Sequence, residues 1–556
     1  ETLVMRQTLS QDDIIAYMDH YLQDKGIILE GFCDRRVESE KVLSRDKAPT
    51  LIEIYQHLLK TIETEFLNDI SAEQLAELEW KIDFNLIIPR KDVCDIFNKV
   101  VDSDKKVYIV SDSYYGKEQL AQILEKCGIT SYIDILSSSD YKTGKRKNLF
   151  EILKRKEHGK RYLHIGDDVV SDIESGLKHG FETYKLMSAI ELLEMLGNLG
   201  FEKYLQALSD RLKIGMFIAK IFNSPFQFEN ENRKIEISEA YDIGYLICAP
   251  MISDFVCWFY ERTQKQNFVN IWFSARDGYL IKKLYNYLMK ISYHEDNSVY
   301  FLTSRIAAIR AGVINDQDIK YVDDMKFSGT LRECLEKRFG INVKDVDYKD
   351  VIDHETGLLC YKKSIIEKAQ NEYINYQKYI SSLNVEDGDI AFFDFVAKGT
   401  SQMYIQRLIT NHLKGFYFMQ LEVENMQDKE LNIQSFYTIE EGKSCSIFDD
   451  YYILETFLTA PHPSVLGFDE YGKPKYAVES RKEGDLNCLL QVQRGITDYF
   501  ANYIAICPEE HRMVNRELDN IFLGLIHKFK FTNKDFLQLV FEDPFFNRMT
   551  NIDDIL

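Results

Sequence analysis

Strands and helices alternate between Lys106 and Leu186, and this alternation constrains the fold more than any other feature of the 556-residue chain. Short apolar runs predict strands at 106–112, 132–137, 161–167 and 181–186, and amphipathic segments predict helices at 117–127 and 149–156. Strands joined by helices of this length form βαβ units, which build a parallel sheet with right-handed crossovers. The sequence therefore predicts an α/β, Rossmann-like core.

The rest of the chain divides into segments of different character. Residues 8–100 are expected to form a helical insert, because apolar residues recur three and four positions apart. After a further helical stretch, strand candidates at 269–274, 298–302 and 389–393 lie among helices, and the periodicity is helical again from about Leu489. We predict three parts: the core with its insert at 1–190, a second α/β domain at 191–488, and a helical C-terminal region at 489–556.

Composition excludes several classes of protein. A formal charge of -21 and a pI near 5.1 argue against a nucleic-acid partner, because such proteins neutralise phosphates with clustered Lys and Arg. The ten cysteines include no Cys-x-x-Cys pair, so a zinc site is not expected. Without an apolar run of about 18 residues or a signal-like segment, we expect no membrane span and a cytoplasmic location.

Polar residues stand at the carboxyl ends of the predicted strands, where open α/β sheets bind ligands. Asp167 and Asp172 are about one helical turn apart after the 161–167 strand, a spacing that lets both carboxylates approach one Mg²⁺ ion. The Ser111 hydroxyl and the backbone N–H groups after it, beginning with Asp112, can bind phosphoryl oxygens, and Lys145 can supply positive charge. Taken singly, each has a structural alternative, such as a helix cap for the serine and a solvated loop position for the lysine.

The order of these residues resembles motifs two, three and four of the haloacid dehalogenase-like (HAD) superfamily. The resemblance implies a phosphoaspartate mechanism with Ser111, Lys145, Asp167 and Asp172 in the matching roles. Asp168 is a second candidate for the metal shell, and Lys142 and Lys147 are alternatives to Lys145.

Motif one of this superfamily carries the aspartate nucleophile at a strand end, followed within a few residues by Thr-Leu. This chain opens with Glu1-Thr2-Leu3, which resembles the tail of that motif. We therefore expect that the nucleophile and its strand precede Glu1, or that the natural protein has lost them.

A wider resemblance extends over most of the chain. It is similar to large predicted HAD-family hydrolases of bacterial surface-polysaccharide gene clusters in the segments 32–43, 77–90, 111–115, 223–226 and 273–279. The resemblance implies that the helical insert is a cap. Together with the three ordered motifs, it leads us to expect activity on a small phosphorylated metabolite, such as a sugar or polyol phosphate, in glycan assembly. The alternative is a catalytically inactive HAD-like scaffold that partners glycosyltransferases.

The second region contains two strand–loop–helix patterns. Arg276 and Asp277 follow the strand at 269–274, and Asp394 and Gly399-Thr400 follow the strand at 389–393. Parallel strands bring their carboxyl ends to one edge, so we expect these residues around one cleft for a ligand with cationic and anionic groups, or for phosphate with a metal. Thr303-Ser304-Arg305 and Glu455 are further candidates for its lining. The alternatives are an ordinary turn, a helix cap and an internal pair of Arg276 with Asp394.

Overall fold

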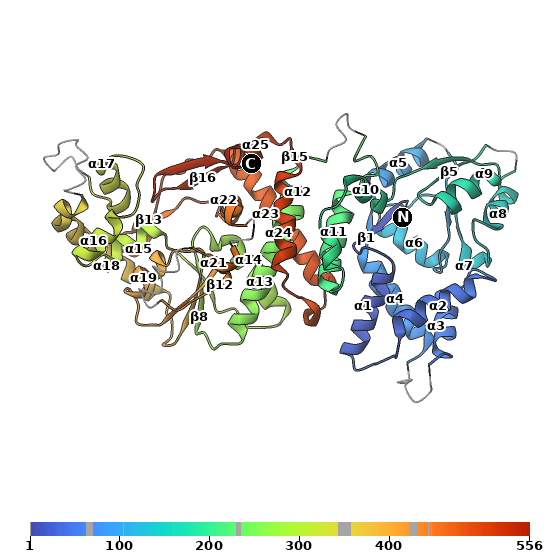
Figure 1. Ribbon diagram of the computed structural model, residues 1–556, viewed down its shortest axis with the longest axis horizontal. Helices are drawn as coiled ribbons and strands as arrows, with labels where there is room; N and C mark the ends of the chain where they lie inside the picture. The colour runs from blue at the N-terminus through green and yellow to red at the C-terminus, as the bar shows by residue number, and fades with distance from the viewer. Residues whose placement is uncertain are drawn as a thin grey trace. The chain divides into compact units, whose positions relative to one another are not determined.

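The structure is a computed structural model that describes residues 2–62, 70–103, 105–158, 161–229, 235–342, 357–421, 431–442, 445 and 447–556. The chain divides into two compact units: unit 1 is Glu1–Ile235 with Asn502–Met513, and unit 2 is Glu236–Ala501 with Val514–Leu556. The structure is mixed α/β with parallel strand pairing, as predicted at that level (Figure 1). The predicted domain boundaries at residues 190 and 488 stay a prediction.

Unit 1 begins with helices framed by a short antiparallel pair, β1 (Val4–Arg6) with β2 (Ile87–Pro89). Between these strands lie α1 (Asp12–Asp24), α2 (Phe32–Ser44), α3 (Leu51–Leu59) and α4 (Ala72–Leu86), grouped together in Figure 1. The start of α3 follows from its sequence, because Thr50 and Glu53 form a capping box. The predicted helical content of the insert is confirmed for the described residues, whereas 63–69 lie outside them.

Two parallel strand pairs follow in unit 1. Strand β3 (Tyr108–Ser111) pairs with β4 (Asp134–Ser137), and β5 (Leu163–Gly166) pairs with β6 (Glu182–Lys185). All four strands lie within the predicted segments, which confirms the alternation of strands and helices. The helices of this part are α5 (Lys91–Asp102), α6 (Lys117–Lys126), α7 (Ser138–Tyr141), α8 (Leu149–Lys156), α9 (Ser175–Lys178), α10 (Ala189–Leu196) and α11 (Leu208–Ile221).

The two pairs share one apolar core without forming one sheet. Leu149, Phe150 and Leu153 of α8 form a cluster with Leu136 of β4 and Phe181 just before β6, and Tyr108 and Val110 of β3 pack against it. No hydrogen-bonded pairing joins β3 to β5 among the described residues. Strand β5 leaves two apolar side chains exposed, Leu163 at 60% and Ile165 at 40%.

Unit 2 contains a five-stranded parallel sheet in the order β12-β11-β10-β8-β9. Its strands are β8 (Asn270–Ser274), β9 (Ser298–Phe301), β10 (Ile390–Ala397), β11 (Leu413–Gln420) and β12 (Ile433–Tyr437). The chain runs from β8 outward to β9, and returns to the other side of β8 for β10. The strand order therefore reverses between β8 and β10, and ligands of open α/β sheets bind at the carboxyl end of such a switch point.

The helices of unit 2 surround this sheet and its loops. They are α12 (Ala240–Ile243), α13 (Ala249–Gln264), α14 (Gly278–Ile291), α15 (Arg305–Gly312), α16 (Asp316–Asp323), α17 (Leu331–Cys334), α18 (Lys362–Ser382), α19 (Thr400–Gln406), α21 (Ile439–Gly442), α22 (Ile447–Leu458), α24 (Arg516–Gly524), α25 (Lys534–Leu537) and α26 (Ile552–Ile555). Helix α23 (Glu483–Ile506) begins in unit 2 and ends in unit 1.

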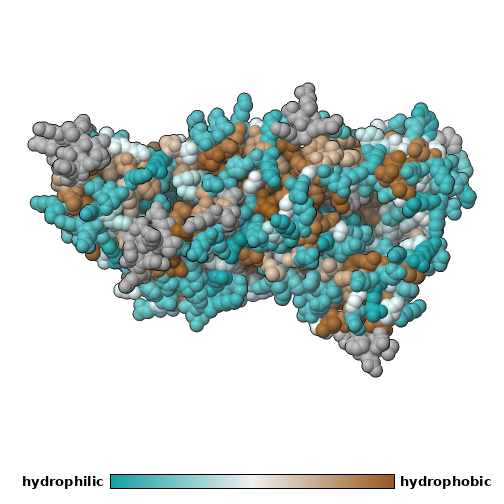
Figure 2. Space-filling model, viewed as in Figure 1, coloured by the Kyte–Doolittle hydropathy of each residue, from teal (hydrophilic) through white to brown (hydrophobic). Residues whose placement is uncertain are grey.

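One helical stretch, Ala240–Gln264, is long and apolar enough to cross a membrane by length and composition. However, 89% of its most apolar window is buried inside the structure. Its Phe255 ring lies 5.4 Å from that of Phe393 in β10 and 5.0 Å from that of Phe418 in β11. The apolar surface of this helix is thus covered by the sheet of unit 2, and the face seen in Figure 2 is mostly hydrophilic with scattered apolar patches.

The predicted helical character of 489–556 is wrong for its last part. Strand β15 (Lys530–Phe531) pairs with β7 (Glu236–Ile237), and β16 (Val540–Asp543) forms an antiparallel hairpin with β17 (Arg548–Asn551). The intervening turn explains the hairpin. Asp543 Oδ1 accepts hydrogen bonds from the backbone N–H groups of Phe545 at 3.0 Å and Phe546 at 3.2 Å. Pro544 disfavours a helix here, and Asn547 has the positive φ of 55° that a tight turn uses.

Candidate functional site

A buried lysine connects the two strand pairs of unit 1. Lys145, in the loop before α8, forms an ion pair through its Nζ atom with Oδ1 of Asp172. Its backbone N–H donates to Asp112 Oδ1 at 2.9 Å, just after β3, and its carbonyl accepts a hydrogen bond from Ser175 Oγ at 2.6 Å. The loop is therefore fixed at both ends, and the lysine amine points to the acidic segment after β5.

Asp172 is held on both carboxylate oxygens. Oδ1 also contacts His164 Nε2 at 2.8 Å, and Oδ2 accepts the Asp168 N–H at 3.0 Å. Burial by itself would raise the pKa of Asp172, but the bonds from His164 and Lys145 hold it far below its usual range. The carboxylate approaches so closely that a Cβ atom on Gly166 would lie 2.3 Å from its Cγ, which explains the glycine before the acidic run.

The other two acids of the run have different surroundings. Asp167 accepts a hydrogen bond from Thr2 Oγ1 at 2.7 Å, which places the start of the described chain at the end of β5. Asp168 is exposed, and its Oδ1 accepts the Ser171 N–H at 2.5 Å, so it caps the π-helical turn η2 (Val169–Glu174). Asp168 is thus engaged in capping this turn, whereas Asp167 contacts the start of the described chain.

The three candidate lysines are clearly separated by the structure. Lys142 Nζ pairs with Glu53 Oε2 at 2.9 Å, and Lys147 Nζ contacts the backbone carbonyl of Asp46 at 3.3 Å. Only Lys145 of the three contacts the acidic run. Ser111 is half-buried at the last position of β3, paired in register with Ser137 of β4, and Glu1 lies outside the described residues.

Carboxylate oxygens are the ligands that Mg²⁺ prefers, and the run after β5 supplies only such donors. Among the described residues, however, no three His, Cys, Asp or Glu side chains are arranged to hold a metal ion. An ion at this place would be held by Asp167 with few other protein ligands, and would complete its shell with water and phosphate oxygens, as Mg²⁺ commonly does.

His164 is a residue that sequence reasoning missed. It lies in β5, its ring packs edge-on against Phe150 at 4.8 Å, and it faces Asp172. The signal was present, because a histidine within an otherwise apolar strand, three residues before a predicted metal ligand, can orient a carboxylate.

In unit 2, the ends of β8 and β10 meet at the switch point. Ser274 Oγ donates to Asp394 Oδ1 at 3.1 Å. Burial raises the pKa of Asp277 to about 7, and the charge of Asp394 adds to the rise. The predicted residues Asp277 and Asp394 are therefore neighbours, each half-buried.

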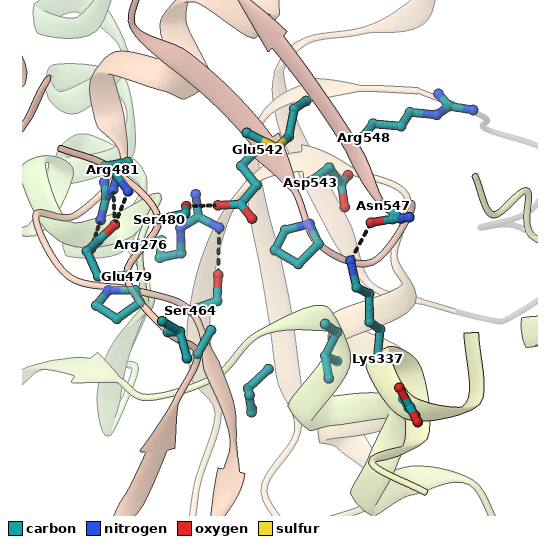
Figure 3. A pocket seen from close by; sticks show the side chains of 18 of the residues that line it. Arg276, Lys337, Ser464, Glu479, Ser480, Arg481, Glu542, Asp543, Asn547 and Arg548 are labelled. Atoms are coloured by element: carbon teal, nitrogen blue, oxygen red, sulfur yellow. Dashed lines mark hydrogen bonds and ion pairs between the residues drawn. The ribbon is translucent and has the colours of Figure 1, made fainter. Parts of the chain in front are cut away.

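The guanidinium of Arg276 lies close enough to Asp277 to offset part of the rise in the pKa of that carboxyl, but its hydrogen bonds go elsewhere. Arg276 has a positive φ of 72°, and it donates from Nε to Thr459 Oγ1 at 3.1 Å and from Nη1 to Ser464 Oγ at 2.6 Å. It lines a cavity of about 440 Å³, where Figure 3 shows it near Ser464, with the Arg481–Glu479 pair close by. The hydrogen bonds of its guanidinium group go to hydroxyl groups instead of Asp394.

Thr400 lines a different, larger cavity of about 1040 Å³. Gly399 has a positive φ of 68° just before α19, and Thr400 Oγ1 lies 3.3 Å from the Tyr321 hydroxyl. Arg305 and Glu455 also line this cavity, and Arg305 pairs with Asp543 at 3.3 Å. The two cavities share Asp543, Asn547, Arg548 and Met549.

Comparisons with known proteins add no name to these sites. No protein-family model matches the chain, and no curated protein is similar to it at a significant level. The case for a function rests on the residues themselves.

Proposed function

We propose that unit 1 is a Mg²⁺-dependent phosphohydrolase or phosphotransferase of the HAD type, acting in the cytoplasm on a small phosphorylated metabolite such as a sugar or polyol phosphate. The observation that carries this proposal is the buried Lys145–Asp172 pair, with Asp167 beside it at the carboxyl end of β5. A strand-end serine, a lysine amine and an acidic run follow one another along the chain, and they can supply the hydrogen-bond donors, positive charge and metal ligands that phosphoryl transfer requires.

The chemistry assigned to each residue follows from its position. Lys145 offsets the negative charge of the transferring group, and the contact with Asp172 holds that lysine in place. Ser111 and the backbone N–H groups after it would bind phosphoryl oxygens. Asp167 would hold Mg²⁺, which supplies further positive charge at the phosphate when bound.

The nucleophile is the part that the described residues do not supply. The resemblance implies an aspartate nucleophile, which takes the phosphoryl group before water releases it as inorganic phosphate. Thr2 contacts Asp167, so the first described residue lies at the acidic run.

The test is phosphate release from aryl and sugar phosphates in Mg²⁺ by the full-length protein. Asp167→Asn should lower turnover by at least ~10²-fold, the scale seen when a key electrostatic group is removed. Asp168→Asn, a matched change at an exposed neighbour, should cost far less. Equal losses would contradict the assignment of Asp167.

The lysines offer a second matched pair. Lys145→Ala should abolish turnover, whereas Lys147→Ala should have a mild effect, because Lys147 contacts only backbone carbonyls. An absence of turnover over a broad panel of phosphates would refute the enzyme proposal. It would favour the alternative, a HAD-like scaffold that partners glycosyltransferases.

A further inference from the structure

Three cationic side chains surround one phenyl ring in the larger cavity of unit 2. Relative to the centroid of the Phe546 ring, Arg305 lies at 5.1 Å, Lys398 at 5.2 Å and Arg548 at 5.4 Å. They come from the start of α15, the loop after β10 and strand β17, so the fold gathers them from distant parts of the chain. Like charges repel one another when they lie within about one Debye length (~10 Å), so gathering three cations costs free energy. The cluster is also unusual because the chain as a whole is strongly acidic.

The two arginines of this cluster differ in their protein contacts. Arg305 pairs with Asp543, but the exposed guanidinium of Arg548 forms neither a hydrogen bond nor an ion pair with any residue that the structure describes. A phosphate group that contacts an arginine and a lysine gains charge-assisted hydrogen bonds, which are the stronger kind. The cluster therefore favours an anionic ligand group at this place.

An acidic residue, Glu455, lines the same cavity as the three cationic side chains. Glu455, in α22, is half-buried, and within the described part of the chain its side chain makes no hydrogen bond or ion pair. Burial raises the pKa of Glu455 well above its usual range, and the neighbouring charge of Asp277 adds to the rise. A carboxyl group that keeps its proton can both donate and accept, which suits a hydroxyl group of a ligand.

Aromatic side chains form part of the wall of this cavity. Tyr451 and Tyr452 have ring centroids 4.0 Å apart, and Tyr452 lies 4.8 Å from Phe541. All three line the cavity. Small-molecule sites are typically lined by aromatic surface with a few polar groups that orient the ligand.

We propose that this cavity binds a phosphorylated sugar, with its phosphate on Arg548 and Lys398, its ring on the aromatic wall and its hydroxyl groups on Glu455. The site lies in unit 2 and does not rest on the function proposed for unit 1. The volume of about 1040 Å³ is at the upper end of ligand pockets, so it accommodates a sugar monophosphate or a nucleoside diphosphate sugar.

The test is isothermal titration calorimetry on the full chain with four probes: glucose 1-phosphate, UDP-glucose, glucose and inorganic phosphate. EDTA is present to prevent turnover in unit 1. We expect at least one of the two phosphorylated sugars to bind ten times more tightly than glucose or phosphate. Tighter binding of UDP-glucose identifies a nucleotide sugar as the source, and tighter binding of glucose 1-phosphate identifies a sugar monophosphate. If neither binds more tightly than inorganic phosphate, the proposal is overturned.

Variants locate the binding. Arg548→Ala should weaken it at least tenfold, whereas Arg494→Ala, a matched exposed arginine outside the cavity, should change it less than twofold. Glu455→Ala should also weaken it tenfold, and Glu455→Gln should retain most of the affinity because an amide still bonds to hydroxyl groups. Unchanged affinity in Arg548→Ala would overturn the proposal even if a sugar phosphate binds. Because Arg548 is exposed, its replacement should leave the fold intact, which circular dichroism can check.

Discussion

Replacement of Lys145 by methionine would leave a buried carboxylate without its lysine partner. The side chains of Lys145 and Asp172 are only 11% and 5% exposed, so solvent screens their pair weakly. Removing one partner of a buried ion pair typically costs 3–5 kcal/mol. Because His164 still contacts Asp172, we expect unit 1 to lose about 3 kcal/mol, near the lower end of that range.

A double-mutant cycle separates the pair from the rest of the site. Asp172→Leu alone should also destabilise unit 1, because it leaves the lysine amine buried without a counter-charge. The double variant Lys145→Met/Asp172→Leu should cost less than the sum of the two single changes, by roughly 1–3 kcal/mol, since no uncompensated charge remains. Thus the two changes should couple strongly.

The measurement must report on unit 1 alone, because a chain with two compact units need not unfold in one step. Pulsed hydrogen exchange in increasing urea, followed on peptides from residues 130–190, meets this need. Lys147→Met is the control, and it should change stability by less than about 0.5 kcal/mol. A loss below about 1 kcal/mol in Lys145→Met, or simple additivity in the double variant, would refute the reasoning about a buried pair.

Three further changes test the electrostatics and packing. The pKa of Asp172 is lowered in the folded state, so the stability that its carboxylate contributes is present above about pH 4 and is lost as the pH falls below that. In acid titrations, wild-type unit 1 should therefore lose more stability between pH 5 and 3 than the Asp172→Leu variant does. The pKa of Asp277 is raised to about 7, so the cost of its charge grows between about pH 4 and 7, and Asp277→Asn should raise the melting temperature at pH 8 but not at pH 4. Gly244→Ala should lower the free energy of unfolding by at least ~2 kcal/mol in denaturant titrations, because its Cβ would lie 2.1 Å from the Val492 carbonyl oxygen. Gly484→Ala is the control and should not destabilise the protein, because its Cβ would meet nothing within 4 Å.

The strands of unit 1 were predictable because each is a short apolar run between polar turns. The helix expected at 149–156 has the bounds of α8, since its apolar residues face one core and its ends are polar. In unit 2, sequence reasoning missed β11 and β12, although the buried run at 416–419 carried the signal of a central strand. The hairpin at the C-terminus was missed because a turn built on Asp543 and Asn547 interrupts what otherwise has helical spacing.

The candidate sites show what sequence order can and cannot supply. Order along the chain brought Lys145 and Asp172 into one hypothesis, but three lysines lie within six positions, and no local pattern distinguishes them. The distinction is made by the loop, because Gly144 lets Asp112 approach closely and accept the Lys145 N–H. Backbone geometry of this kind cannot be predicted from any single residue type.

The cation cluster around Phe546 was still less predictable. Arg305, Lys398 and Arg548 are separated by 93 and 150 positions, and each stands in a segment that would be an ordinary solvated surface by itself. They meet because the sheet order reverses between β8 and β10, which leaves room above the carboxyl ends of the strands, and because the β16–β17 hairpin carries Arg548 to the same cavity. A binding site assembled from three distant segments depends on topology, so the sheet order predicts its location while the sequence alone predicts only its parts.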